Sequence, residues 1–287
     1  MIDSIFILLI LSTFRMSLPL MFATCGGYFS EKSGVAQISL EAFLLVGAFT
    51  AASVSFFSGT LLLGYLAAGV MAALFGQIFC IFTLKLKAHS IIVGTALNLL
   101  VMGLIPIVSK SVFDSTGSTP SINADNVYYA LPVTILIVTI TAAFWLSNRT
   151  IWGLQMKFAG EKRLALESIG VNPIIRQWQA VTLCAFITGL GGAVLSTYLS
   201  SNYSPLMSAG RGFIALAALI FAGWSLRRAL LVSLFFGFCE ALQIQLQSNQ
   251  LISSRIPAEF IQMIPYAATL LALIFLRAKN NPPAELR

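Results

Sequence analysis

The sequence predicts an all-α fold, a polytopic transmembrane helical bundle of about eight or nine membrane segments in two inverted halves with broken helices. Three observations predict it: the composition, the length of the apolar runs and the placement of the charges. Of the 287 residues, 58% are hydrophobic and only 9% are charged. Soluble globular chains carry about a quarter charged residues, so this chain has too few polar side chains to cover a soluble domain.

The apolar runs are close to the roughly 20 residues that a helix needs to cross about 30 Å of hydrocarbon. They lack the alternation of a membrane barrel, and a spanning chain must satisfy its backbone internally, which favours helices. We expect a single transmembrane domain over residues 1–287, with approximate halves 1–110 and 129–277. The expected segments are 4–26, 38–57, 60–84, 89–109, 129–147, 177–199, 211–223, 229–247 and 259–276.

The charges between the runs predict the orientation. Residues 148–176 form the longest strongly charged loop, and its excess of lysine and arginine places it in the cytoplasm. The segment 111–128, with Asp114 and Asp125, then lies outside. The formal charge of +7 therefore follows the positive-inside pattern and forms no patch for nucleic acid. The other basic residues that fall on the cytoplasmic side are Lys85, Lys87, Arg227, Arg228, Arg277, Lys279 and Arg287.

Small residues mark two expected helix contacts. Ala68, Ala72 and Gly76 repeat at every fourth position, and three glycines lie within residues 189–192. Small side chains let helices approach closely in lipid, so both groups predict packing between helices.

Two segments depart from ordinary membrane spans. Residues 26–49 place two glycines, Glu31 and Lys32 between apolar runs, and residues 208–224 open an apolar stretch of about a dozen residues with Gly-Arg-Gly. Transporters often build their pathway from such interrupted helices in corresponding positions of two halves. The alternative is two ordinary interfacial turns. A break near residues 27–38 would also reverse the first helix, which strict alternation starts outside, so both orientations stay open.

Ionisable residues inside apolar segments are costly in lipid and tend to mark function. The candidates are Arg15, Glu41, Arg211 and Glu240. Arg15 has a simpler alternative role, because its long side chain can reach the interface or pair with an acid. Glu240 shares one helix face with two glutamines, Gln243 and Gln247, so that face must contact protein or water.

No catalytic or metal-binding constellation converges in the sequence. It holds no phosphate-binding loop, no His-Glu-x-x-His and no nucleophile elbow. His89 stands alone and the four cysteines lack CxxC spacing, which favours buried thiols over a metal site. We therefore expect no enzyme, no bound cofactor and no metal, and any ATP must be hydrolysed by another chain.

Four stretches together resemble one family. GYFSEKSGVAQISLEAFLLVGAF resembles the pattern G-x-x-x-E-R-x-G-V-x-N-I-x-L-E-G near the start of bacterial ABC-transporter permeases of the nucleoside and simple-sugar class, related to the branched-chain amino acid and ribose importers. GRGFIALAALIFAGW is similar to the second broken segment of these permeases, FAGEKRLALESIGVNPIIRQ to their cytoplasmic coupling helix and GTALNLLVMGL to a further stretch. The chain departs at Lys32, Gln37 and Ala42, where the family has Arg, Asn and Gly.

The resemblance implies an importer of nucleosides or related sugar-like solutes, multi-pass in the bacterial cytoplasmic (inner) membrane. Its expected partners are a second homologous permease subunit, two ATP-binding subunits that carry ATP and Mg²⁺, an external substrate-binding lipoprotein and membrane lipid, without nucleic acid. The residues assigned to the substrate pathway are Gln37, Glu41, Asn98, Arg211 and Phe213, and those assigned to ATPase coupling within loop 148–176 are Gly160, Arg163, Leu166 and Gly170.

Two other functions stay open from the residues alone. A self-sufficient secondary transporter of a small polar solute would need a titratable pair in the membrane, such as Glu41 or Glu240 with Arg15. An intramembrane enzyme or assembly factor is disfavoured by the missing catalytic cluster.

Overall fold

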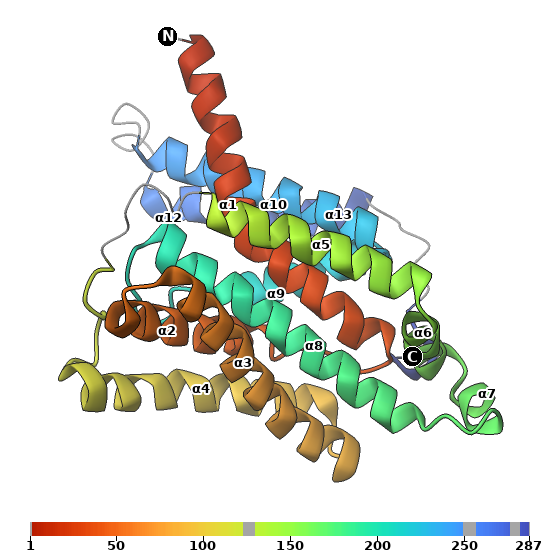
Figure 1. The fold of residues 1–287 in the computed structure, drawn as a ribbon. Helices are drawn as coiled ribbons and strands as arrows, with labels where there is room; N and C mark the ends of the chain where they lie inside the picture. Colours follow the sequence, from red (N-terminus) through yellow and green to blue (C-terminus); the bar gives the residue numbers. More distant parts are fainter. Residues whose placement is uncertain (1, 123–129, 249–256, 276–281, 287) are drawn as a thin grey trace.

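The computed structural model describes residues 2–122, 130–248, 257–275 and 282–286, and these residues form helices and connecting turns (Figure 1). Short π-helices, η1 (Ile81–Lys85) and η3 (Leu195–Leu199), extend α3 and α8, and a 3-10 turn, η4 (Ala284–Leu286), lies near the C-terminus. The helices are α1 (Ile2–Lys32), α2 (Leu40–Ser58), α3 (Leu61–Cys80), α4 (Ser90–Phe113), α5 (Leu131–Arg149), α6 (Ile151–Glu161), α7 (Arg163–Ser168), α8 (Pro173–Val194), α9 (Arg211–Phe221), α10 (Leu226–Ser248), α12 (Ala258–Gln262) and α13 (Ile264–Phe275).

Seven helices in the described part of the chain are long and apolar enough to cross a membrane. This confirms an all-α chain with several candidate membrane spans, whereas the total of eight or nine segments and the inverted halves stay predictions. Two further apolar helices are shorter, Arg211–Phe221 and Phe260–Leu270. The seven long helices are Ile7–Lys32, Leu40–Ser58, Leu61–Lys85, Ser90–Phe113, Leu131–Arg149, Pro173–Leu199 and Leu226–Ser248.

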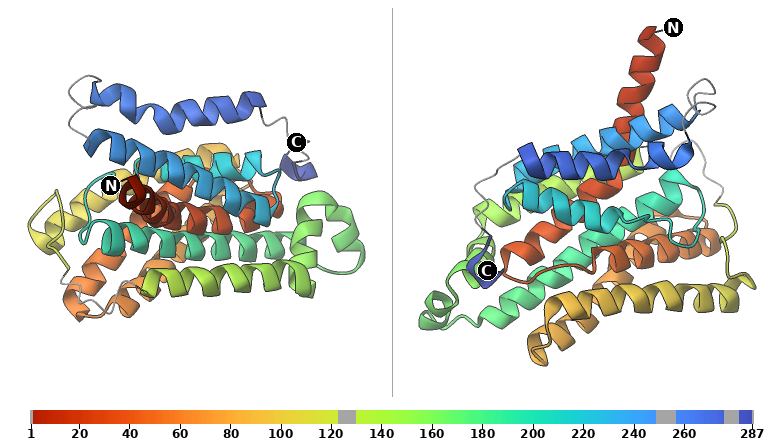
Figure 2. Two further views of the ribbon diagram at one scale, coloured as in Figure 1. Left: turned by 90° about the horizontal axis from the view of Figure 1, so that it is seen from above. Right: turned by 180° about the vertical axis from the view of Figure 1, so that it is seen from behind.

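Helix α8 is the centre of the bundle. It packs against α1, α2 and α3, and α1 also packs along α10 (Figures 1 and 2). Helices α4 and α5 lie at the edges of the bundle, with 28% and 22% of their apolar windows buried against 83% for α8. Their apolar side chains are largely uncovered by the rest of the chain, as expected for helices that contact lipid.

The glycines of α8 make these close contacts possible. A Cβ on Gly189 would lie 2.5 Å from the Cβ of Ala72 on α3, and one on Gly192 would lie 2.2 Å from the Leu44 carbonyl oxygen on α2. Both distances are too short for any side chain, so α8 approaches two neighbours backbone to backbone. The helix contacts predicted from small residues are confirmed.

The first break falls later than predicted. Helix α1 continues through Gly26 and Gly27 to Lys32, and the irregular residues are 33–39. Gly26 does not break α1 because it serves a contact: a Cβ there would lie 2.6 Å from the Cys184 carbonyl oxygen on α8. A glycine in a membrane helix can thus mark close packing as well as a break.

The structure also orients α1. Its last residue, Lys32, contacts Glu161 of α6, within the loop predicted to be cytoplasmic, and the start of α1 lies at the other end of the bundle (Figure 1). With loop 148–176 in the cytoplasm, α1 begins outside, as strict alternation predicts. Four charges used in the orientation argument lie outside the described residues: Asp125, Arg277, Lys279 and Arg287.

Candidate functional site

The short helix α9 begins inside the bundle. Its 11 residues span about 16 Å, roughly half of the hydrocarbon core. The irregular segment 200–210 leads from the end of η3 to Gly210, which has a left-handed backbone with φ of 80°. Gly212, in the first turn of α9, is buried. The first N–H groups of this helix therefore need partners from the protein.

Glu41 supplies those partners. The Gly212 N–H donates to Glu41 Oε2 at 2.7 Å, and the Gly210 N–H donates to Oε1 at 2.9 Å. The Ser208 hydroxyl donates to Oε1 at 2.5 Å. Glu41 is only 2% exposed. A carboxylate at a helix N-terminus is stabilised by hydrogen bonds to the free N–H groups and by the helix dipole.

Arg211 pairs with a different carboxylate. Its Nε and Nη2 atoms each lie 3.1 Å from Glu240 Oε2 on α10, and its Nη1 donates to the Met207 carbonyl oxygen at 3.1 Å. Glu41 is thus the acid at the start of α9, and the ion pair of Arg211 is with Glu240. Successive residues of a helix point about 100° apart, so the Gly212 N–H faces α2 while the Arg211 side chain reaches α10.

The Arg211–Glu240 pair opens onto a polar cavity. The cavity has a volume of about 340 Å³. Two amide side chains, Gln243 and Gln262, face it together with the ion pair. The predicted polar stripe on α10 therefore lines a cavity at two of its three positions, Glu240 and Gln243, whereas Gln247 lies beyond the lining. The remaining lining residues are Ala209, Ile214, Ile244 and Pro265.

The other residues assigned to the substrate pathway divide into two groups. Gln37 and Asn98 are buried and bonded within the chain: Asn98 accepts from the Ala42 N–H at 3.0 Å and donates to the Ile38 carbonyl oxygen at 3.1 Å. They hold the start of α2. Because their side-chain amides already have partners within the chain, they need no open, water-filled cavity beside them. Phe213 is 46% exposed. Their roles in a pathway stay predictions.

Glu31 binds the opposite end of α9. The Trp224 indole N–H donates to Glu31 Oε2 at 3.0 Å, and the Gln37 backbone N–H donates to Oε1 at 2.8 Å. The sequence places Glu31 between two apolar runs but does not predict this bond. The signal was Trp224 itself, because a buried indole N–H requires an acceptor and few are available in so apolar a chain. The last turn of α1, through Glu31, and the first turn of α2, through Glu41, therefore hold α9 at both ends.

The connection between α1 and α2 also touches loop 148–176, which its charges predict to be cytoplasmic. A Cβ on Gly160 of α6 would lie 2.5 Å from the Lys32 carbonyl oxygen and 2.8 Å from the Gly34 nitrogen. Beside it, Lys32 Nζ lies 2.8 Å from Glu161 Oε1. Backbone contact and ion pair together join α6 to the turn that follows α1, so a movement of one displaces the other.

Within that loop, α7 turns Leu166 inward and Leu164 outward, and the coupling roles assigned to the loop stay predictions. Leu166 is 2% exposed and packs inside the chain, whereas Leu164 is 80% exposed. A helix of six residues can bury one side, and the turn closed by Gly170, with φ of 76°, folds back over Leu166 through the Val171 N–H. Leu164 is therefore the leucine of α7 that is available to a partner, next to the exposed Ile169. Arg163 lies on the surface, 3.9 Å from Glu167.

The comparisons with known proteins decide the family. The model of the permease component of branched-chain amino acid transport systems matches residues 9–273. The chain belongs to this family. It is 30% identical to the nucleoside ABC transporter permease protein NupC of Lactococcus lactis, over 94% of the chain and 92% of that protein. It is also 30% identical to the guanosine ABC transporter permease protein NupQ of Bacillus subtilis, over 96% and 93%. No solved structure matches significantly.

The permease is thus a multi-pass, non-catalytic transmembrane subunit of an ABC transporter. Its family implies partners that hydrolyse ATP and that bind the substrate. The structure is consistent with a non-catalytic subunit. Its buried acids, Glu31 and Glu41, hold α9 in place, and the Gly160 contact links α6 to the segment between them.

Proposed function

We propose that this permease carries nucleosides or related ribose-bearing solutes into a bacterial cell across the cytoplasmic membrane. The observation that carries the proposal is the similarity to two permeases named for nucleosides and for guanosine, at 30% identity over more than nine tenths of each chain. The family description refers to branched-chain amino acids, so the solute class needs support from the chemistry of the site.

The cavity beside α9 suits a neutral polar solute. Its volume of about 340 Å³ lies within the range of roughly 300–1,000 Å³ common for small-molecule pockets. The side-chain amides of Gln243 and Gln262 both donate and accept hydrogen bonds, as ribose hydroxyls and base edges require. The Arg211 and Glu240 charges bind each other at 3.1 Å, which leaves neither free to hold the charged groups of an amino acid.

We propose that the working transporter contains a second homologous permease subunit, two ATP-binding subunits that carry ATP and Mg²⁺, and an external lipoprotein receptor. The surface around Leu164 and Arg163 would contact an ATP-binding subunit. The apolar side chain and its flanking charges suit docking of a short helix into a groove. Movement of α6 would pass through Gly160 to the turn after Lys32, and from there to both ends of α9.

The test is uptake of labelled solutes by a bacterial host that lacks nucleoside uptake and expresses the whole transporter. We expect uptake of labelled guanosine or uridine that unlabelled nucleosides inhibit and that excess glucose or leucine does not. Inhibition by glucose or leucine alone would contradict the nucleoside assignment. Omission of the permease gene and inactivation of the partner ATPase are the two controls, and each should reduce uptake to background.

The ATPase control also separates the secondary transporter. Arg15 donates to the Tyr198 carbonyl oxygen at 2.9 Å and lies over the Tyr198 ring, while Glu41 and Glu240 are bound around α9. The pair that such a transporter would use is therefore not formed. Uptake that continues with an inactive ATPase would favour the secondary transporter.

A further inference from the structure

A second cavity lies at the cytoplasmic end of the bundle, between α1, α5, α6 and the start of α10. Its volume is about 600 Å³. Three basic side chains line it, Lys32, Lys157 and Arg227, and Glu161 is the one acidic residue among the described residues of the lining. Because Glu161 Oε1 lies 2.8 Å from Lys32 Nζ, its charge is already matched.

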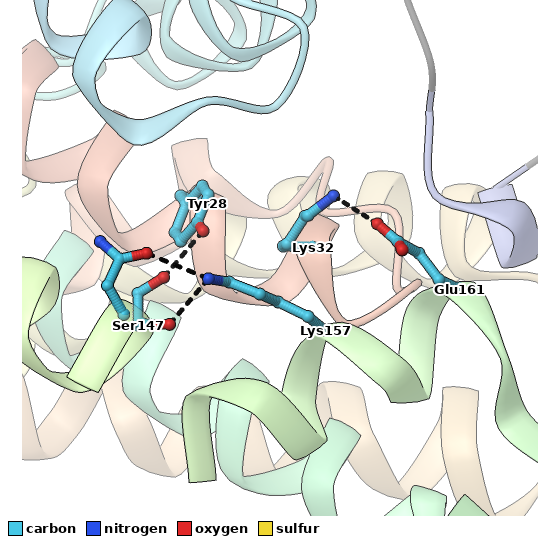
Figure 3. A network of polar contacts seen from close by, with 6 residues as sticks. Tyr28, Lys32, Ser147, Lys157 and Glu161 are labelled. Atoms are coloured by element: carbon cyan, nitrogen blue, oxygen red, sulfur yellow. Dashed lines mark hydrogen bonds and ion pairs between the residues drawn. The ribbon is translucent and has the colours of Figure 1, made fainter. Parts of the chain in front are cut away.

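Lys157 has no carboxylate partner within 4.0 Å in the described part of the chain. Its amine donates to the Ser147 carbonyl oxygen at 2.7 Å and to Asn148 Oδ1 at 3.1 Å, and both acceptors are neutral (Figure 3). Burial lowers the pKa of Lys157, the nearby Lys32 charge lowers it further, and the Glu161 charge raises it. Glu161 offsets one of the three positive charges, so the described lining keeps two that an anion would neutralise.

Arg227 completes the basic side of the cavity. Its guanidinium lies over the Phe144 ring, 5.8 Å from the centroid. A guanidinium stacked in this way keeps its edge N–H groups free, and these fit the oxygens of a phosphate. No ion pair joins Arg227 to a described carboxylate.

The outer wall of the cavity is apolar. Helix α6 exposes Ile151, Leu154 and Phe158, at 76%, 55% and 38%, with helical spacing along one side. Lys157 and the close-packed Gly160 lie on its other sides. An amphipathic helix at the end of a bundle, apolar outward and basic inward, is typical of one that lies in the membrane interface.

We propose that this cavity binds the phosphate of an anionic phospholipid from the cytoplasmic leaflet, with Lys157 and Arg227, the two bases that Glu161 does not neutralise, as its ligands. The acyl chains lie against Leu154 and Phe158. Basic pockets between helices on the cytoplasmic side are suited to such headgroups. The bound lipid bridges α6 and α10 next to the Lys32–Glu161 contact, so it sets the position of the helix that leads to the ATPase-facing loop.

Native mass spectrometry of the full chain tests the site, with phosphatidylglycerol and phosphatidylcholine as probes. We expect retention of phosphatidylglycerol in preference to phosphatidylcholine. Each charge removed, by Lys157→Gln or Arg227→Gln, should weaken phosphatidylglycerol binding about fivefold. The matched controls, Lys162→Gln and Arg228→Gln, remove neighbouring charges outside the cavity and should leave binding unchanged. Lys157→Arg retains the charge and should retain most of the affinity, which separates loss of the site from loss of the fold.

Inorganic phosphate distinguishes the sources of the anion. We expect no displacement of phosphatidylglycerol by millimolar phosphate, because the acyl chains contribute to lipid binding and a free ion lacks them. Equal retention of phosphatidylcholine, unchanged binding in the Lys157→Gln, Arg227→Gln double variant, or full displacement by free phosphate would each overturn the proposal.

Discussion

Glu31 and Glu41 bind opposite ends of the same short helix. Glu41 accepts hydrogen bonds from the Gly210 and Gly212 N–H groups at the start of α9, and Glu31 accepts one from the Trp224 indole just after its end. Glu31 lies in the last turn of α1 and Glu41 in the first turn of α2, on either side of the connection 33–39. A helix too short to cross the membrane is thus positioned by a single segment of chain, and that segment also touches α6 through Gly160.

Replacement of Glu41 should destabilise α9. Glu41→Ala leaves two buried N–H groups without acceptors, at a cost of about 1–3 kcal/mol each, and should reduce both the melting temperature and transport. Glu41→Gln keeps an acceptor but loses the charge at the helix N-terminus, so we expect an intermediate effect. The control is Glu167→Gln, at a half-exposed carboxylate on α7. Full stability and full transport in Glu41→Ala would contradict a structural role for the carboxylate.

The Arg211–Glu240 pair predicts a specific rescue. Removal of either charge leaves the other nearly buried, which typically costs about 3–5 kcal/mol. Arg211→Glu with Glu240→Arg should recover part of the stability lost in either single variant. Glu41→Arg with Arg211→Glu should recover none, because these side chains form no ion pair. Melting temperatures of the single and double variants give the coupling energy of each pair, and recovery in the second pair alone would refute the assignment.

The sequence predicted the parts of this chain that depend on local patterns. Apolar length predicted the long helices within about four residues, except that α1 continues to Lys32 and not to residue 26, and the Gly-Arg-Gly at 210–212 predicted where the short helix begins. It failed where two distant segments meet. The Arg211–Glu240 and Glu31–Trp224 contacts join residues 29 and 193 positions apart, and no spacing rule within one helix reports such pairs.

The glycines of α1 show the same limit of prediction from local sequence patterns. Gly26 and Gly27 read as a break because glycine disfavours a helix in water, yet in the bundle Gly26 makes room for the Cys184 carbonyl group. Only the neighbouring helix decides between the two roles. Leu166 is a second example, because a six-residue helix has too few turns for its buried side to show in the sequence.

Gly160 should be intolerant of any side chain. A Cβ there would lie 2.5 Å from the Lys32 carbonyl oxygen, so Gly160→Ala must displace α6 from the turn after α1. We expect transport to fall while the ATPase continues to hydrolyse ATP, measured in the reconstituted transporter. The matched control is Gly103→Ala on α4, where a Cβ has no neighbour within 4 Å. Normal transport in Gly160→Ala would show that this contact carries no coupling.

Leu164 and Leu166 should give opposite phenotypes. Leu164→Asp changes an 80% exposed side chain, so the chain should fold and insert normally but lose ATPase partners during purification. Leu166→Asp buries a charge inside the loop and should lower the melting temperature of the chain purified alone. Partner recovery and melting temperature, measured for both variants, separate the two effects. Loss of partners in Leu166→Asp without any loss of stability would restore Leu166 as the contact residue.

Cysteine substitution distinguishes the exposed residue of the assigned pathway from the buried ones. Phe213 is 46% exposed beside the start of α9, whereas Asn98 is 4% exposed. Phe213→Cys should therefore react with a water-soluble thiol reagent if water reaches α9, and Asn98→Cys should stay inert in the resting transporter. The four native cysteines are buried, so the unmodified chain gives the background.

Protection by substrate then tests whether the space through which water reaches α9 is the transport pathway. A saturating nucleoside should slow the modification of Phe213→Cys in the assembled transporter, because the family resemblance assigns Phe213 to the substrate pathway, although it does not line the cavity beside Arg211. Leucine should give no protection, because the paired charges of Arg211 and Glu240 are not free to bind its amino and carboxylate groups. Reaction of Asn98→Cys at the rate of Phe213→Cys would mean that the start of α2 opens during transport. Inertness of Phe213→Cys would place that side chain against lipid or a second subunit and would remove it from the pathway.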